Sequence, residues 1–259
     1  ARDRAEEERI AQWVAHMENA LKGEGFVQFF QPIIHLAGDP EENYQALLRL
    51  TGPNGDIVSP SVFMPIAEEH GMMARIDRWV IQRAIVAISQ RKRSNRDTRL
   101  FVKITAESLQ DPQLAAWIAA NLKQTDVPAE NLVLCLPESM VFTNLKQVQE
   151  LQSALKSIGC RLCLEQFGLG LNSFQLLSHV EADYLAIDRS LIDDLSKNAE
   201  NQKKVKEIIE HASSKNRATI AEGVQDAGTM TVLFTSGIDY VMGHFLSEPS
   251  REMNFDFNQ

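Results

Sequence analysis

Apolar residues follow two alternating patterns along this chain. Short apolar runs bounded by turn residues are typical of buried strands, and the segments between most of them repeat apolar residues every three or four positions, as amphipathic helices do. The predicted helices between the strands cover residues 60–70, 74–93, 112–124, 144–158, 200–216 and 226–236. The eight predicted strands begin at Phe26, Tyr44, Arg99, Leu132, Cys160, Tyr184, Arg217 and Asp239.

The order of these elements predicts the fold class. Strands that alternate with helices are typical of parallel crossover units, and eight strands close a (β/α)8 barrel. The first two strands differ, because residues 37–40 between them (Ala-Gly-Asp-Pro) have the chemistry of a hairpin turn. We therefore expect an α/β fold, a TIM-like (β/α)8 barrel with an antiparallel first strand. A length of 259 residues suits one such barrel.

The N-terminal segment predicts one further helix. Residues 2–22 open on a run of charged residues, but their apolar residues, Trp13 and Met17 among them, recur at helical spacing. Gly23 follows the last of these and favours the end of the helix. We expect residues 1–24 to be a connector helix from an upstream domain and residues 25–259 to form the barrel domain.

Composition and charge exclude some functions. The chain has 26 Lys and Arg against 35 Asp and Glu, a formal net charge of −9. Binding of duplex nucleic acid needs a basic face, so we do not expect it here. A small phosphate ligand stays open, because a single Arg in a cleft can bind it. No apolar run approaches the roughly 18 residues of a membrane helix, so we expect no membrane span.

The cysteines indicate a compartment. The chain has three, Cys135, Cys160 and Cys163, and so low and odd a number favours a reducing environment over a disulfide framework. We therefore expect a cytoplasmic protein. Cys160 and Cys163 lie three residues apart on a predicted strand, so their side chains should face opposite sides and could not hold a metal together.

Barrel active sites lie at the carboxyl ends of the strands. Carboxylates at several of these ends could hold a hard cation, but a Lys, a Cys and a Met stand among them, which does not form an oxygen cage. The six histidines show no metal-ligand spacing either. From the second strand onward, the strand ends carry Arg49, Lys103, Cys135 with Glu138, Glu165 with Gln166, Asp188, Glu222 and Met242.

Motifs between residues 26 and 251 resemble those of the EAL-domain family, whose enzymes are cyclic di-GMP phosphodiesterases. The family's Q-P-I stands at residues 31–33, and its E-A-L-L-R appears as Q-A-L-L-R at 45–49. Its S-P-x-x-F-I-P-x-A-E-E matches residues 59–69, its K-I-D-R-S residues 186–190, and its V-A-E-G-V-E residues 220–225. The resemblance implies a barrel with a reversed first strand, as the element order also predicts.

The chain departs from the family where its enzymes bind metals and catalyse hydrolysis. Two-metal hydrolysis needs anionic oxygens to hold the cations. The family's metal-binding positions are here Gln45, Lys103, Cys135, Glu165 and Gln166, its catalytic lysine is Ala186, a glutamine is replaced by Met242, and Glu222 alone is unchanged. The resemblance therefore implies no catalytic residue, no metal ligand, no cofactor and no magnesium requirement. Lys103 could lie near ligand phosphates or pair with a barrel carboxylate.

The positions that hold the dinucleotide in similar domains match the family better in this chain than the catalytic positions do. Arg49 could meet a phosphate with two donors, Asp77 could accept from a guanine edge, Phe245 could stack on a base and Glu248 could accept from a second guanine. Each has an ordinary alternative: a barrel ion pair, a surface charge, a core residue and a solvated charge, respectively. The ligand-binding residues that the resemblance implies are Gln31, Leu47, Leu48, Arg49, Ser59, Asp77, Glu222, Met242, Phe245, Glu248 and Pro249.

The resemblance is strongest to non-enzymatic members of the family. It implies a catalytically inactive receptor that binds cyclic di-GMP without metal and relays the signal to a PilZ-domain protein in the regulation of type IV pili and twitching motility. Such members carry degenerate GGDEF and sensory domains upstream. Two alternatives remain: a weak residual phosphodiesterase, and an interaction scaffold that binds no nucleotide.

Overall fold

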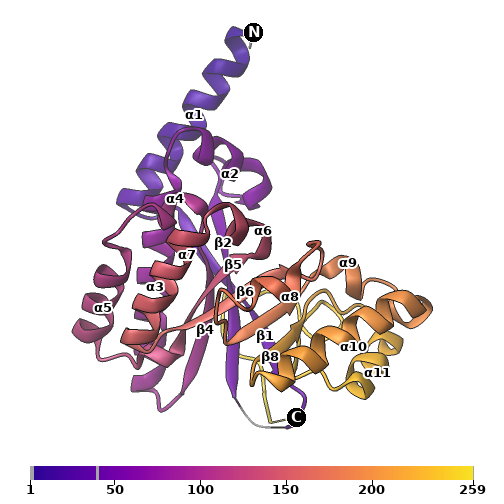
Figure 1. Ribbon diagram of the computed structural model, residues 1–259. Helices are drawn as coiled ribbons and strands as arrows, with labels where there is room; N and C mark the ends of the chain where they lie inside the picture. Colours follow the sequence, from indigo (N-terminus) through magenta and orange to yellow (C-terminus); the bar gives the residue numbers. More distant parts are fainter. Residues whose placement is uncertain (1–2, 39–40, 259) are drawn as a thin grey trace.

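The computed structural model describes residues 3–38 and 41–258, which form a ring of strands surrounded by helices (Figure 1). The strands are β1 (Phe26–His35), β2 (Glu42–Thr51), β3 (Ile57–Val58), β4 (Thr98–Lys103), β5 (Leu132–Pro137), β6 (Arg161–Phe167), β7 (Tyr184–Ile187), β8 (Ala218–Ala221) and β9 (Tyr240–Val241). The helices are α1 (Arg4–Lys22), α2 (Pro60–Glu69), α3 (Met73–Arg93), α4 (Ala106–Leu109), α5 (Leu114–Thr125), α6 (Glu138–Thr143), α7 (Leu145–Ile158), α8 (Ser173–Leu176), α9 (Arg189–Ile192), α10 (Ala199–Ser214) and α11 (Ala227–Ser236).

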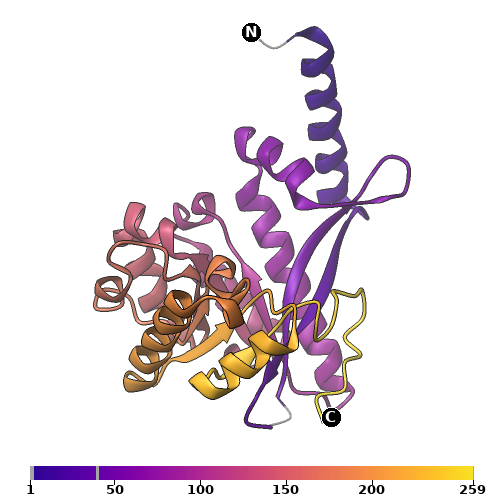
Figure 2. The same ribbon diagram turned by 90° about the vertical axis from the view of Figure 1, so that its right-hand side faces the viewer.

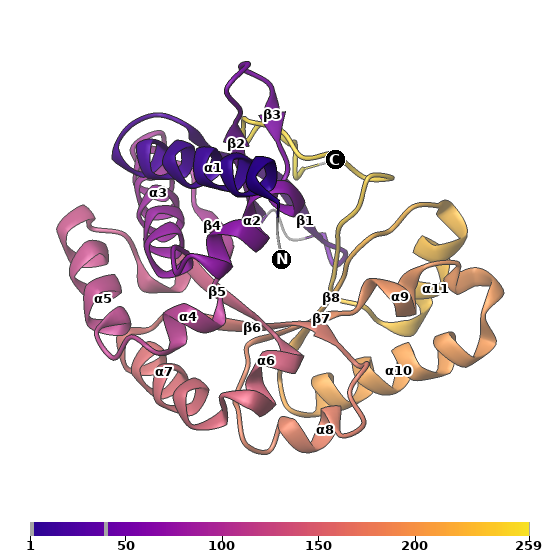
Figure 3. The same cartoon turned by 90° about the horizontal axis from the view of Figure 1, so that it is seen from above.

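The strands close into a barrel in the order β1-β9-β8-β7-β6-β5-β4-β2, and β2 pairs with β1 to complete the ring. β1 is antiparallel to both of its neighbours, and all the other neighbours within the ring are parallel. The predicted TIM-like barrel with an antiparallel first strand is therefore confirmed. Figure 3 looks onto this ring, with α3, α5, α7, α10 and α11 around it.

The sequence patterns missed the shortest elements. β3 pairs antiparallel with β2 outside the ring. Helices α4, α6, α8 and α9 follow β4, β5, β6 and β7 in turn, and none is longer than six residues. Elements of fewer than two turns show no measurable apolar period, so the pattern could not predict them. Residues 39–40 of the predicted hairpin turn, and the predicted helix start at residue 2, lie outside the described residues.

Two apolar layers hold the barrel together. The outer faces of the strands pack against the helices, and this layer includes Cys160. The inner faces form a second, smaller cluster that includes Cys135, Cys163 and Met242. Cys160 and Cys163 thus face opposite sides of the barrel wall, as predicted, because side chains alternate along a strand.

Helix α1 is attached to the barrel by its C-terminal half. Met17 is fully buried there, and the helix packs against α2, α3 and β1. Two hydrogen bonds join Arg75 of α3 to the Glu18 carboxylate, at 2.5 and 2.8 Å. The N-terminal half of α1 projects away from the barrel (Figure 1). Neither α1 nor any other helix within the described ranges has the length and apolar character needed to cross a membrane.

The β1–β2 hairpin extends beyond the barrel. β2 pairs with β4 only from Glu42 to Gln45, whereas its pairing with β1 continues to Leu50. Because β2 runs parallel to β4, the extra length lies past the carboxyl ends of the other strands. The hairpin therefore forms a wall beside the mouth of the barrel, and Figure 2 shows it rising toward α1.

Candidate functional site

The lower part of the hairpin wall is fixed by two glutamines. Gln31 of β1 and Gln45 of β2 are register partners, and both are buried. Gln45 Nε2 donates to the Phe101 carbonyl of β4 at 3.4 Å. Gln31 Nε2 donates to the Ser247 carbonyl at 3.2 Å, which ties the wall to the C-terminal loop. The mouth is thus bounded by segments far apart in sequence.

Arg49 lies farther up the same face of the wall. Its guanidinium carbon is 5.6 Å from the centre of the Phe29 ring, and Arg251 approaches that ring at 5.8 Å. Arg49 Nη1 donates to the carbonyl of Leu48 at 2.9 Å, and burial lowers the pKa of this Arg. Within the described residues it has no carboxylate partner. The predicted barrel ion pair is therefore not seen, and the guanidinium is available to an external anion.

The two leucines beside Arg49 point in opposite directions. Leu47 shares the face of Arg49, because side chains alternate along β2. Leu48 packs against the outer apolar layer. Only the backbone of Leu48 can therefore contribute to the mouth.

Asp77 does not join this face. It is 3% exposed on α3, and its Oδ2 accepts from the Thr105 backbone N–H at 2.8 Å, from Thr105 Oγ1 at 2.7 Å and from Ser108 Oγ at 2.5 Å. These bonds attach α3 to the start of α4. Asp77 is therefore not the surface charge that was the alternative, and its Oδ2 is engaged by hydrogen bonds within the chain. Ser59 is exposed just before α2 and shares a hydrogen bond with Ser61 at 2.8 Å.

Charged side chains from three strands meet at the mouth. Lys103 ends β4, Glu165 lies on β6, and Glu222 directly follows β8. Glu165 is 4% exposed, and its Oε1 is buried without a hydrogen-bond partner. The negative charges of Glu165 and, to a lesser extent, Glu222 raise the pKa of Lys103. Burial raises the pKa of both carboxyls, against the opposing charge of Lys103.

The C-terminal loop, which contacts the wall through Ser247 and Ser250, also borders the mouth. Met242 is buried with the inner cluster, whereas Phe245 is 49% exposed and Glu248 is exposed. Phe245 borders a cavity of about 360 Å³ that also involves Arg189, Gly223, Gln225 and His244. Phe245 is therefore not a core residue, and its ring is accessible. Pro249 follows in the same loop.

Two residues that the sequence placed at strand ends, Glu138 and Gln166, shape the mouth in ways that the sequence did not predict. Glu138 is buried, and its Oε2 accepts from the Gly168 N–H at 3.2 Å, which holds the loop after β6. Gln166 has a φ of +50°, a left-handed conformation that is uncommon for residues other than glycine. It lies in the irregular stretch of β6 between Leu164 and Phe167. Only the backbone geometry shows this left-handed conformation.

The donors at the mouth do not fit a pair of divalent cations. Gln45 offers a neutral amide, Lys103 brings a positive charge, and burial raises the pKa of the Cys135 thiol well above its usual range, so it stays uncharged. Magnesium and similar ions prefer several anionic oxygens. In the part of the chain that the structure describes, no three His, Cys, Asp or Glu side chains are placed to hold a metal ion.

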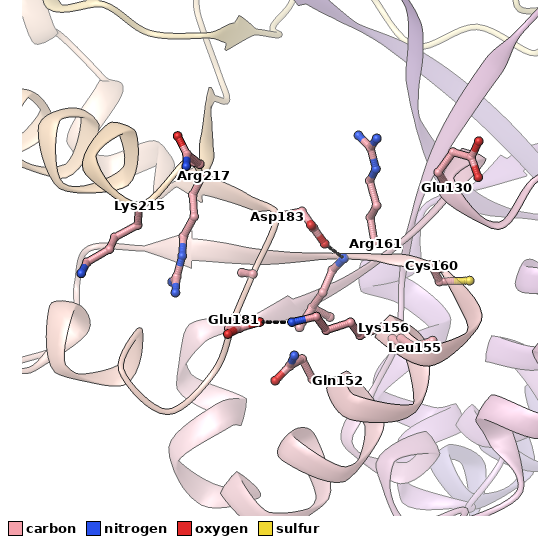
Figure 4. A pocket seen from close by; sticks show the side chains of 14 residues that line it. Glu130, Gln152, Leu155, Lys156, Cys160, Arg161, Glu181, Asp183, Lys215 and Arg217 are labelled. Atoms are coloured by element: carbon pink, nitrogen blue, oxygen red, sulfur yellow. Dashed lines mark hydrogen bonds and ion pairs between the residues drawn. The ribbon is translucent and has the colours of Figure 1, made fainter.

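Another cavity lies at the opposite end of the barrel. It has a volume of about 660 Å³ and lies by the amino ends of β6, β7 and β8 (Figure 4). Its charges are already engaged in part: Lys156 pairs with Glu181 at 2.8 Å, and Asp183 accepts from the Leu162 N–H at 2.9 Å. Barrel chemistry belongs to the carboxyl ends of the strands, so the mouth is the better candidate site.

Comparison with known families and structures gives a consistent result. The family model described as "EAL domain" matches residues 14–249. Among solved structures, the chain is 44% identical to the FimX EAL domain of Xanthomonas citri in complex with c-diGMP, with a TM-score of 0.94 and coverage of 98% of this chain and 100% of that one. The FimX EAL domain of Pseudomonas aeruginosa bound to c-di-GMP is 36% identical, with a TM-score of 0.90 and coverage of 95% and 99%.

Curated relatives include enzymes that are longer than this chain. The chain is 29% identical over 233 residues to the cyclic di-GMP phosphodiesterase PdeF of Escherichia coli, which covers 90% of this chain and 31% of that protein. It is 28% identical to the cyclic di-GMP phosphodiesterase NbdA of Pseudomonas aeruginosa, over 90% of this chain and 30% of NbdA. The chain thus spans about a third of the length of these relatives.

Replacing Asp77 should change how stability depends on pH. Burial raises the pKa of Asp77 from 3.8 to about 6, so the folded state holds a proton that the unfolded state releases. The protonated Asp77 contributes its full stabilisation below about pH 4. As pH rises from there through 6, the free energy of unfolding falls by about 2–3 kcal/mol, at 1.36 kcal/mol per unit of pKa shift. We expect Asp77→Asn to remove this loss, as measured by chemical denaturation between pH 4.5 and 7. Exposed Asp56→Asn is the control, and equal pH profiles for wild type and Asp77→Asn would contradict the prediction.

Proposed function

The chain belongs to the EAL domain family, and from this premise we propose that it is a receptor that binds cyclic di-GMP without metal and does not hydrolyse it. The observation that carries the proposal is the contrast between the two parts of the mouth. The hairpin wall keeps an unpaired guanidinium at Arg49, whereas a Lys, a neutral amide and a neutral thiol stand among the remaining carboxylates.

The mouth can bind both chemical parts of a cyclic dinucleotide. A guanidinium offers paired donors to a phosphate, and Arg49 and Arg251 bring two such groups to Phe29. In the C-terminal loop, the exposed Phe245 ring offers a stacking surface beside a cavity. Gln31 connects the wall to this loop through Ser247. The two FimX domains, whose structures contain this ligand, support the proposal.

Hydrolysis needs more than binding. Two-metal phosphodiester cleavage requires cations that acidify a water and stabilise the leaving oxygen. Of the carboxylates at the mouth, Glu165 and Glu222 both feel the positive charge of Lys103. Divalent cations bound to these two carboxylates would therefore be repelled by the Lys103 ammonium. The donor set therefore supports binding and gives no support to two-metal catalysis.

A protein partner completes the proposal. We infer that the receptor relays its ligand state to a PilZ-domain protein in the control of type IV pili and twitching motility, in a longer protein with degenerate GGDEF and sensory domains upstream. The similarity to FimX EAL domains over nearly the whole chain supports this role.

Ligand affinity should depend on Arg49 and not on divalent metal. Loss of a partly buried charged contact costs about 2–5 kcal/mol, and about 1.4 kcal/mol is tenfold in affinity, so Arg49→Ala should weaken cyclic di-GMP binding at least about 30-fold. Calorimetric titration with magnesium and with EDTA should give the same affinity. Arg83→Ala removes an exposed Arg that stacks on Trp79 of α3 and is the matched control. Abolition of binding by EDTA, or intact binding by Arg49→Ala, would refute the metal-free receptor.

We expect no hydrolysis of cyclic di-GMP with magnesium or manganese. Gln45→Glu alone should not restore it, because Lys103, Cys135, Gln166 and Ala186 still lack the required chemistry. Chromatography of the reaction should show no linear dinucleotide above a protein-free control, while an active EAL phosphodiesterase assayed in parallel yields product. Product formed by the wild-type chain would favour the residual-enzyme alternative.

The partner proposal predicts a stable complex. The chain and the PilZ-domain protein of the same organism should elute together in gel filtration, and each protein run alone should elute separately. The comparison is made with and without cyclic di-GMP. Separate elution under both conditions would count against the relay.

A further inference from the structure

A positive side chain occupies the centre of the barrel mouth, where two buried or half-buried carboxylates converge. Lys103 of β4 is the register partner of Cys135 on β5, and Cys135 is the partner of Cys163 on β6. Both cysteines belong to the inner cluster. Because Glu165 is two residues beyond Cys163, it points to the same inner side. Register therefore aims Lys103 and Glu165 at the same space.

The cavity at this position confirms that the two side chains share a space. It has a volume of about 500 Å³ and is lined by Lys103 and Glu165 together with Gln166 and Glu107. Glu222 enters from the other side, two residues after Ile220 of the inner cluster. Glu165 is 4% exposed with its Oε1 unpartnered. Burial favours the neutral form of such a carboxyl, and a nearby cation favours its charged form.

We propose that the ammonium of Lys103 is the resident cation of this mouth, holding Glu165 and Glu222 as counter-charges and excluding a divalent ion from them. This inference deepens the proposed function, because it assigns the metal-free state to one residue. The geometry supports it, because Lys103 is the only Lys or Arg among the described residues that line the cavity of Glu165.

The neighbouring groups cannot take this role. Arg189 also acts on Glu222, but its side chain packs over Gly223, where a Cβ would lie 2.6 Å from Arg189 Nε. Glu165 has no Arg among the charges that shift its pKa. Lys103 is thus the cation that strand register and the shared cavity place beside Glu165. A divalent ion between them would have to displace it, because like charges a few ångströms apart repel strongly in a partly buried site.

The test measures manganese binding and needs no nucleotide. Gln45→Glu supplies one carboxylate and keeps Lys103, whereas Gln45→Glu/Lys103→Asn also replaces the ammonium by an amide oxygen. Loss of the free-ion signal in electron paramagnetic resonance should show manganese binding at least about tenfold tighter to the double variant. Gln45→Glu/Lys103→Arg keeps the charge and should bind as weakly as Gln45→Glu. Gln45→Glu/Lys146→Asn, altered at an exposed Lys of α7, should do the same.

Two results would overturn the inference: manganese binding by Gln45→Glu as tight as by Gln45→Glu/Lys103→Asn, or no binding by either. If the double variant does not fold by circular dichroism, the single variant Lys103→Asn is compared with wild type and must bind manganese more tightly. Failure of cyclic di-GMP binding is a separate result, because the manganese titration contains no nucleotide.

Discussion

The antiparallel pairing of β1 is the constraint on which the rest of the structure depends. β1 closes the ring through only Ile34 and His35 on β9, and through a much longer ladder with β2. Because the reversed strand runs away from the mouth toward the closing pair, its first half lies above the barrel beside β2. This geometry creates the wall that carries Gln31 and Arg49. Beyond Gln45, where β2 leaves β4, the ladder with β1 continues to Leu50 and supports the part of β2 that carries Arg49.

The same wall connects the N-terminal helix to the mouth. His16 of α1 lies with its Nε2 2.6 Å from the Thr51 carbonyl, two residues beyond Arg49. Met17 of the same helix is fully buried in the outer layer. The C-terminal half of α1 is therefore part of the barrel's packing, although its sequence alone suggested a connector. Helix α1 and the strand that carries Arg49 are therefore joined by a direct contact at Thr51.

Charge separates binding from catalysis in this barrel. An anionic ligand needs donors and stacking surfaces, which Arg49 of the wall and Phe245 of the C-terminal loop offer. Two-metal catalysis needs an excess of anionic oxygens, and here Lys103 offsets the charge of Glu165 and Glu222. Substitutions at the base of the mouth can therefore remove the second capability without disturbing the wall that supports the first.

The sequence by itself determined the barrel, because eight apolar runs separated by helical periods and one turn motif leave few other ways to bury those faces. It also placed Arg49, Lys103, Glu165 and Glu222 at strand ends. Only the tertiary structure decided what each side chain faces. Asp77 turned out to be bonded to Thr105 and Ser108, and Leu48 to face the helices. The short helices after β4 to β7 and the left-handed Gln166 were not predictable either. Local patterns specify which residues are apolar and where a strand ends, whereas hydrogen bonds between segments tens of residues apart exist only after the ring has closed.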